Sequence, residues 1–196
     1  LSKGIENLEA HIDNLTKNFG LPVVVAINRF PTDSPEELEL VKSRCEARKV
    51  RYAVSEVVAR GGEGGAELAQ QVLEALESDT NNFHTLYDLE IPAEDKIRKL
   101  AKDVYGADEV VFAEGAKTML GTIRKIGYGQ LPVCMAKTQH SLSDNPDLKG
   151  RPTGWKLTVR EVRVSAGAGF IVALTGEVMT MPGLPKVPAA DSIDIL

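Results

Sequence analysis

Apolar residues recur at alternating spacings of four and three positions at the start of the chain, which is the pattern of a helix with one buried face. They are Leu1, Ile5, Leu8, Ile12, Leu15 and Phe19. The pattern predicts a helix that ends at Gly20, and the apolar run 23–27 predicts a buried strand. Ser34, Pro35 and Glu37 then supply an N-cap, a first-turn proline and a capping-box glutamate, which predict the start of a second helix.

A second strand is predicted over residues 52–60, running into the glycine-rich stretch 61–65, and a further helix follows up to Ser78. Strand and helix alternate through this region, which predicts a parallel sheet with right-handed crossovers. We therefore expect an α/β fold whose first part is the second half of a P-loop-type, mostly parallel sheet.

The polar run 79–83 predicts a change of structural unit. Beyond it, the pattern predicts a helix over 97–104, a strand over 110–112, a helix over 116–126 and a strand over 131–136. Residues 137–155 are rich in turn-forming residues and predict a long loop, which in a compact domain is usually functional. We expect two domains, residues 1–80 and residues 81–196, the second being a smaller α/β carboxy-terminal unit with long loops.

The last strong strand pattern changes phase along its length. Leu157 and Val159 share one face, but Val162 and Val164 fall on the other. A β-bulge near the dipeptide Arg160-Glu161 would reconcile the two halves. The pattern therefore predicts a strand over 156–164 with one irregular position.

Composition excludes several classes of function. The formal net charge is −5 and Lys and Arg do not cluster, which argues against a nucleic-acid surface. No apolar run approaches about 18 residues and the start does not resemble a signal peptide, which argues against membrane insertion of this segment. Cys45 and Cys134 lack C-x-x-C partners, so we expect reduced core thiols in a cytoplasmic protein.

Two loops could contact a nucleotide. Asn28 and Asp33, after the first strand, form a loosened version of the Asn-Lys-x-Asp motif with which P-loop hydrolases bind a base, and ligands of open α/β sheets bind beyond the carboxyl ends of strands. The alternative is that both residues only cap the next turn. Ser165, Gly167 and Gly169 would let backbone approach a nucleotide closely, although G-x-G before a strand is not a dinucleotide fingerprint.

Seven blocks of the sequence resemble one known family, formate–tetrahydrofolate ligase, also called 10-formyltetrahydrofolate synthetase. The blocks are PVVVAINRFPTD, SEVVARGGEGG, LYDLEIPAEDKI, YGADEV, LPVCMAKTQHSLSDNP, GRPTGW and SAGAGFIVALTGEVMTMPGLPKVPAA. They follow the order of the family and cover nearly the whole chain.

The resemblance implies an activity and its substrates. It implies ATP-dependent ligation of formate to tetrahydrofolate through a formyl phosphate, with ATP and Mg²⁺, a monovalent cation and a homotetrameric assembly. It also implies that residues 1–80 are the carboxy-terminal part of a nucleotide- and folate-binding domain, and that the remainder of the polypeptide is a partner of this segment.

The resemblance also assigns residues. It implies that Phe30 and Pro31 line the tetrahydrofolate site, and that Val58 takes the place of a family Trp that stacks on the other side of the pterin. The substitution removes a stacking surface worth about 0.5–1.5 kcal/mol. Val54 would still supply an apolar wall. Arg60 and Lys137 are candidate contacts for a carboxylate or phosphate, although each alone is more often a solvated charge.

The phosphate-binding loop of the family has no counterpart here. No G-x-x-x-x-G-K-S/T run occurs in the 196 residues, and the stretch 136–138 lacks the glycines that would turn backbone N–H groups toward a phosphate. We expect the chain to be the carboxy-terminal segment of a longer enzyme, inactive by itself, with its catalytic residues upstream of Leu1. The alternative is a non-catalytic binding or assembly domain of the same fold.

Other chemistries find little support. His11, His84 and His140 lack partners at metal-ligand spacing, so no protein-held metal is expected. Ser141 and Ser143 lack the G-x-S-x-G context of a serine hydrolase. Of the two alternatives for Trp155, core and cleft, we favour the core.

Overall fold

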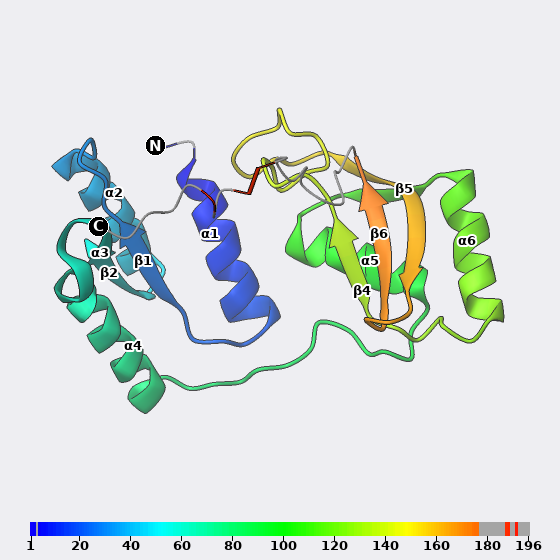
Figure 1. Cartoon of the computed structure of the whole chain (residues 1–196), viewed down its shortest axis with the longest axis horizontal. Helices are drawn as coiled ribbons and strands as arrows, with labels where there is room; N and C mark the ends of the chain where they lie inside the picture. Colours follow the sequence, from blue (N-terminus) through cyan, green and yellow to red (C-terminus); the bar gives the residue numbers. More distant parts are fainter. Residues whose placement is uncertain (3, 177–186, 189–190, 192–196) are drawn as a thin grey trace.

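The computed structural model describes residues 1–2, 4–176, 187–188 and 191. In these residues the chain forms α/β structure around two separate β-sheets (Figure 1). The predicted α/β class is confirmed, and both sheets contain parallel strand pairs. Every helix in the described part of the chain is too short or too polar to cross a membrane.

The first sheet has two parallel strands, β1 (Val24–Asn28) and β2 (Arg51–Ser55). The helices α1 (Ile5–Asp13) and α2 (Pro35–Ala47) cover one face and share a small apolar core with it. The buried members of that core are Ile12, Val25, Ile27 and Cys45.

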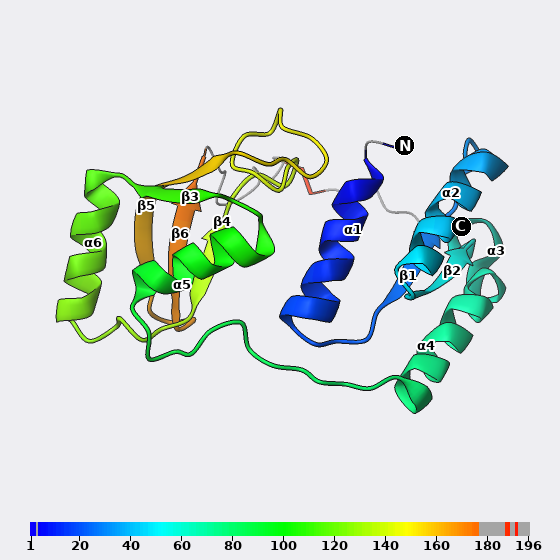
Figure 2. The same cartoon turned by 180° about the vertical axis from the view of Figure 1, so that it is seen from behind.

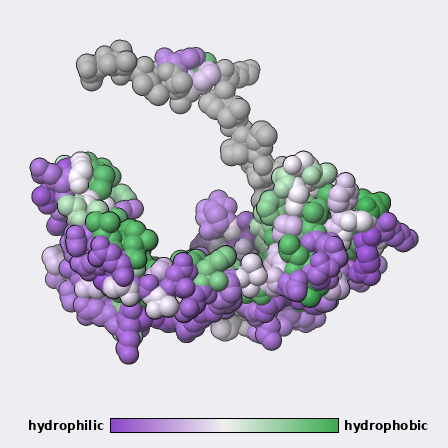
Figure 3. Space-filling model, turned by 90° about the horizontal axis from the view of Figure 1, so that it is seen from below, coloured by the Kyte–Doolittle hydropathy of each residue, from purple (hydrophilic) through white to green (hydrophobic). Residues whose placement is uncertain are grey.

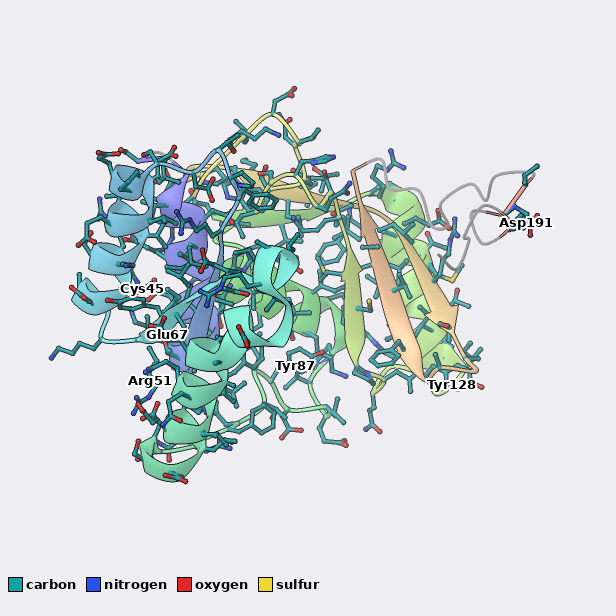
Figure 4. All side chains as sticks on the ribbon, turned by 60° about the vertical axis from the view of Figure 1, so that its left-hand side comes forward. Cys45, Arg51, Glu67, Tyr87, Tyr128 and Asp191 are labelled. Carbon is teal, nitrogen blue, oxygen red and sulfur yellow. The ribbon has the colours of Figure 1, made fainter. Side chains whose placement is uncertain are left out.

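The other face of β2 is covered by α4 (Ala66–Ser78). Ala53 alternates with the core-facing Tyr52 and Val54 and is fully buried on this opposite face. At the start of the strand, Arg51 lies beside the end of α4, where its guanidinium donates to Glu74 and Asp79, each at 3.0 Å (Figure 4). The helices therefore lie on both faces of the sheet, as in doubly wound α/β folds.

Local sequence signals explain the helix boundaries. The Ser34 hydroxyl accepts the Glu37 N–H at 3.2 Å, while the Glu37 carboxylate accepts the Ser34 N–H at 3.1 Å, so the predicted capping box is confirmed. α1 continues as a π-helical segment, η1 (Asn14–Asn18), before Gly20 turns the chain with φ of +67°. The left-handed conformation at Gly20 is one that L side chains rarely adopt.

The second sheet has four strands in the order β3 (Glu109–Phe112), β5 (Lys156–Ser165), β6 (Phe170–Thr175) and β4 (Val133–Ala136). The pairs β3–β5 and β4–β6 are parallel, whereas β5–β6 is an antiparallel hairpin. α5 (Ala93–Lys99), its π-helical continuation η3 (Leu100–Val104) and α6 (Glu114–Lys125) pack on the sheet through a core that includes Ile97, Leu120 and Leu157.

The β-bulge predicted in β5 is present. The pairing register with β6 shifts between Val159 and Glu161, so Leu157, Val159 and Val162 are all buried on one face. Trp155, just before the strand, is buried in the same core, as predicted.

Two sequence predictions were wrong. The second strand was expected to reach residue 60, but β2 ends at Ser55 and residues Val57–Arg60 form a short helix, α3, followed by a 3-10 turn, η2 (Gly61–Gly65). Cys134 was expected in the core, but its side chain is exposed on β4, while Cys45 is buried as expected. β4 is an edge strand packed on one face only, so its alternate residues have no covering layer among the described residues.

An extended segment joins the two sheets. Residues 79–92, between α4 and α5, cross from one to the other without regular structure (Figures 1 and 2). η1, the continuation of α1, also bridges them: the side-chain amides of Asn14 and Asn18 donate to the carbonyl oxygens of Val104 and Asp103 at 2.9 and 2.7 Å. The division into domains at residue 80 stays a prediction.

Candidate functional site

The carboxyl ends of β1 and β2 lie side by side and present two loops. Asn28 is opposite Ser55 in the parallel register, and the Arg29 N–H donates to the Ser55 carbonyl oxygen at 3.0 Å. The residues that follow, 28–34 and 55–65, are called here the strand-end rim. This rim is where ligands of open α/β sheets bind.

The first loop of the strand-end rim is held by Asp33. Its carboxylate accepts the Phe30 N–H at 2.8 Å, and its own N–H donates to the Phe30 carbonyl oxygen at 3.0 Å. These bonds support the alternative in which Asp33 stabilises its own turn. A base contact by Asp33 or by the exposed Asn28 stays a prediction.

Phe30 projects from this turn with 62% of its surface exposed, and Pro31 beside it is also exposed. The ring therefore has little packing of its own, although its backbone is fixed on both sides. An exposed aromatic ring on a fixed loop is suited to stacking on a planar ligand.

The second loop begins with a carboxylate that binds two arginines. Glu56 accepts from the Arg29 guanidinium at 2.8 Å and from the Arg60 guanidinium at 3.1 Å. The hydrogen bond from Arg60, together with that from Arg29, lowers the pKa of Glu56 against the raising effect of burial. Arg60, predicted as an anion contact, is thus already paired, and a ligand anion would compete with Glu56 for it. Glu56 was missed at the sequence level, although its spacing of four from Arg60 was readable.

The short helix α3 exposes two valines. Val58 is fully exposed and Val57 about half exposed, so α3 adds apolar surface to the strand-end rim. Val54 lies elsewhere: it is half-buried and packs against the core beneath α1 and α2. Of the predicted folate residues, Phe30, Pro31 and Val58 are therefore on the exposed rim and Val54 is below it.

The glycine-rich turn folds back on the end of β2. The Glu56 N–H donates to the Gly64 carbonyl oxygen at 3.0 Å, and a Cβ placed on Gly64 would come within 2.5 Å of the Glu56 carbonyl group. Gly62, by contrast, faces open space. Gly64 is therefore required by packing, and the turn is closed around the backbone of Glu56.

The residues Ser165, Gly167 and Gly169 are not brought to the strand-end rim. They form the tight turn of the β5–β6 hairpin, in which the Gly169 N–H donates to the Ser165 carbonyl oxygen at 2.9 Å. Figures 1 and 2 show this hairpin at the lower end of the four-stranded sheet, apart from the upper end of β1. The turn explains why glycine is present, since Gly169 has a φ of +74°. A nucleotide contact by these three residues stays a prediction.

Lys137 anchors the long loop 137–155. Its ammonium donates to the carbonyl oxygens of Thr138, at 2.8 Å, and of Ser141, and lies 5.0 Å from the ring centroid of Tyr105. Burial lowers the pKa of Lys137, with Asp144 acting in the opposite direction. The side chain thus has a structural role that the sequence pattern did not reveal.

The groove beside the extended segment lies away from the strand-end rim. A groove of about 1050 Å³ runs along the extended segment and is lined by Phe19, Phe83 and Tyr87 among others. In the described residues, no group of three or more His, Cys, Asp or Glu side chains could hold a metal ion. What the rim offers is an aromatic ring, apolar surface and a paired arginine.

The comparison with protein families decides the identity of the chain. The family model for formate–tetrahydrofolate ligase matches residues 1–196. The chain belongs to this family. Formate–tetrahydrofolate ligases join formate to the folate carrier of one-carbon metabolism, so ATP and tetrahydrofolate are the substrates that the family implies.

Proposed function

We propose that this chain supplies the folate wall and the base wall of an ATP-dependent formate–tetrahydrofolate ligase. The observation that carries the proposal is Phe30, an exposed ring whose loop is fixed by Asp33 at the carboxyl end of β1. The exposed Val57 and Val58 of α3 extend the apolar surface at the same end of the sheet. A pterin ring could stack on Phe30 with its other face toward this apolar surface.

The proposed reaction activates formate before it is transferred. A formate oxygen attacks the γ-phosphorus of ATP and ADP leaves, which converts the formate oxygen into a good leaving group. N10 of tetrahydrofolate then attacks the formyl carbon, phosphate leaves and N10 loses its proton, giving 10-formyltetrahydrofolate. In this scheme the strand-end rim binds and orients N10, because a correctly placed nucleophile removes much of the entropic barrier.

The arginines of the strand-end rim fit the charge of the substrates. Folate carboxylates and nucleotide phosphates are anionic, and Arg29 and Arg60 are held together by Glu56. We propose that one of them turns from Glu56 to the bound anion. Asn28 and Asp33 would contact the nucleotide base of ATP. Lys137 would act by ordering its loop. Ser165, Gly167 and Gly169 of the β5–β6 hairpin would contact the nucleotide at a place apart from the strand-end rim.

The phosphoryl-transfer groups belong, in this proposal, to the rest of the polypeptide. Mg²⁺ would offset charge on the nucleotide phosphates when bound. The described residues do not form a site that fits it. The homotetramer, the monovalent cation and the cytoplasmic location are likewise proposals taken from the resemblance.

The decisive experiment measures turnover with and without the rest of the enzyme. We expect the product of the complete reading frame to form 10-formyltetrahydrofolate from formate, ATP and tetrahydrofolate. The 196-residue chain alone should release no formate-dependent ADP, after a co-purifying upstream fragment has been excluded. Formate-dependent ADP release by the chain alone would contradict the division of roles.

The valine at position 58 favours a second candidate, a binding or assembly domain without turnover. At this position the resemblance predicts a Trp, and the valine offers no second stacking surface. A complete reading frame that encodes no P-loop, or whose product binds folate without turnover, would support this candidate.

A further inference from the structure

A cavity of about 370 Å³ lies between the two sheets, where α1 and η1 meet η3 and the long loop. Lys17 of η1, Lys102 of η3 and Arg151 of the long loop all lie on its walls. Every residue of the strand-end rim is described, and none of them lies on these walls. The cavity is therefore a separate candidate site with its own set of side chains.

One carboxylate on the wall of this cavity binds three cations. Asp13 accepts from Lys17, Arg48 and Arg151 at 2.7, 2.6 and 3.1 Å. Glu9 offsets the charge of Arg48, to which it is bound at 2.9 Å. Lys17 and Arg151 therefore share the single charge of Asp13, which leaves one positive charge of this cluster without a counterpart.

Lys102 adds a second positive charge to the wall. Its neighbour Asp103 is already paired with Lys99 at 2.7 Å, and Lys102 itself forms no ion pair in the part of the chain that the structure describes. Hydrophilic residues cover much of the surface in Figure 3, where cations and anions share one colour. The sign of the charge therefore distinguishes this cavity, which is positive in a chain of formal net charge −5.

The cations keep hydrogen-bond donors that a ligand can reach. An arginine guanidinium has five N–H groups and a lysine ammonium has three. Arg151 and Lys17 each donate to Asp13 through one nitrogen, while their side chains are 45% and 72% exposed. Thr153, which carries a hydroxyl, lies on the same wall. An anion can therefore bind here without displacing Asp13.

The charge, the donors and the size of the cavity fit a phosphate group. A phosphate monoester carries about 1.5–2 negative charges at pH 7 and three strong acceptor oxygens, which matches the two positive charges that lack a counterpart. Arginine binds phosphate through paired N–H groups and lysine binds it as a point charge. A volume of about 370 Å³ lies near the lower end of the range for small-molecule sites, roughly 300–1,000 Å³, and suits a compact anion.

We propose that this cavity binds a phosphate group, either as the free ion or as the monoester of a small molecule, between Lys17, Lys102 and Arg151. The site is separate from the proposed ligase reaction and does not rest on it. The three cations belong to η1, η3 and the long loop, which are far apart in the sequence. A bound phosphate would therefore connect these three segments and stabilise the folded state.

Phosphate titration of the complete enzyme tests the site. Sodium chloride keeps the ionic strength constant, so that screening of surface charges does not change during the titration. We expect the melting temperature to rise by roughly 1–4 °C at about ten times the dissociation constant and to saturate. A melting temperature that does not respond to phosphate at constant ionic strength would overturn the proposal.

Two variants show whether the phosphate binds in this cavity. Lys102→Gln removes a charge without breaking an ion pair of the described residues, and should raise the dissociation constant for phosphate by roughly three- to tenfold. The control Lys125→Gln changes an exposed lysine at the end of α6, outside the cavity, and should leave the dissociation constant unchanged. Phosphate bound at the proposed catalytic site would not depend on residue 102. Equal dissociation constants for the wild type and Lys102→Gln would therefore overturn the proposal.

Three anions distinguish the possible ligands. Inorganic phosphate and glycerol 3-phosphate represent the free ion and a monoester, and tighter binding of either one supports the proposal and assigns the source. Succinate carries two negative charges but spreads them over two separate carboxylates, so it should bind at least roughly threefold more weakly than phosphate. Equal binding of succinate would show that the cavity accepts any dianion, and would overturn the assignment to phosphate.

Discussion

Phe30 exposes its ring at the tip of a loop whose backbone is fixed by Asp33. We expect Phe30→Ala in the complete enzyme to raise the KM for tetrahydrofolate by roughly two- to tenfold, because stacking contributes about 0.5–1.5 kcal/mol beyond area burial. The KM for ATP should change less. The matched control is Phe83→Ala, which removes a similarly exposed ring from the extended segment. A change in the KM for ATP alone would indicate that the loop binds the nucleotide base instead.

At position 58 the resemblance predicts a Trp, whereas this chain has Val. If α3 faces the pterin, Val58→Trp should tighten tetrahydrofolate binding by up to roughly tenfold, which corresponds to about 1.4 kcal/mol. The valine is fully exposed, so a larger side chain does not clash in the free protein. Calorimetric titration of wild type and variant measures the effect, with Val111→Trp on β3 as the control. An unchanged dissociation constant in a folded variant would show that Val58 points away from the ligand.

Asp13 accepts hydrogen bonds from Lys17, Arg48 and Arg151 at 2.7, 2.6 and 3.1 Å. Burial alone raises the pKa of Asp13, but these three partners lower it to about 2, from 3.8. A lowered pKa stabilises the folded state above about pH 4 by up to about 2 kcal/mol, and this contribution is lost as the pH falls toward 2.

We therefore expect Asp13→Asn to lower the free energy of unfolding at pH 7, and the difference from wild type to shrink as the pH falls below 4. Urea denaturation at several pH values measures it. The control Asp108→Asn removes an exposed carboxylate near the start of β3. A difference that is the same at pH 3 and pH 7 would rule out the ion pairs as its cause.

At the scale of the element, two glycines of the glycine-rich turn differ in what an added Cβ would contact. Gly64→Ala should destabilise the protein by about 1–3 kcal/mol, because its Cβ would meet the backbone of Glu56 at 2.5 Å. Folate binding should weaken with it, since the turn supports α3. Gly62→Ala is the matched control, because a Cβ there meets nothing within 4 Å. Equal melting temperatures for the two variants would mean that the turn opens without cost.

Elements whose signals are local were predicted well. The capping box at Ser34 and the bulge after Val159 follow from the sequence because each depends on a few neighbouring residues. The end of β2 was missed: valines favour strands, but the turn around Gly64 closes onto Glu56, and residues 57–60 between them form a short helix. The role of Lys137 was not readable, because it depends on the distant Tyr105 and on how the long loop folds.

At the scale of the whole molecule, α1 joins the two sheets. Asp13 binds Arg48 of α2 and Arg151 of the long loop, while the Asn7 amide donates to the Gly150 carbonyl oxygen at 3.2 Å. The extended segment 79–92 supplies the covalent link, but α1 supplies the contacts. Periodicity predicted the helix, whereas its bridging role could not be read from the sequence, because its contacts with the long loop span more than 100 positions of the chain.

The bulge in β5 also makes the length of this strand adjustable at one point. Val159 and Val162 both face the core, and the two residues between them occupy the place of one. Deleting Arg160 would restore simple alternation and keep both valines buried, whereas deleting Thr158 would expose Val159 and bury an arginine. We expect the first deletion to give folded protein and the second to give aggregates, as judged by size-exclusion chromatography. We therefore expect loss of one codon to be tolerated at position 160 of this strand and to be harmful at position 158.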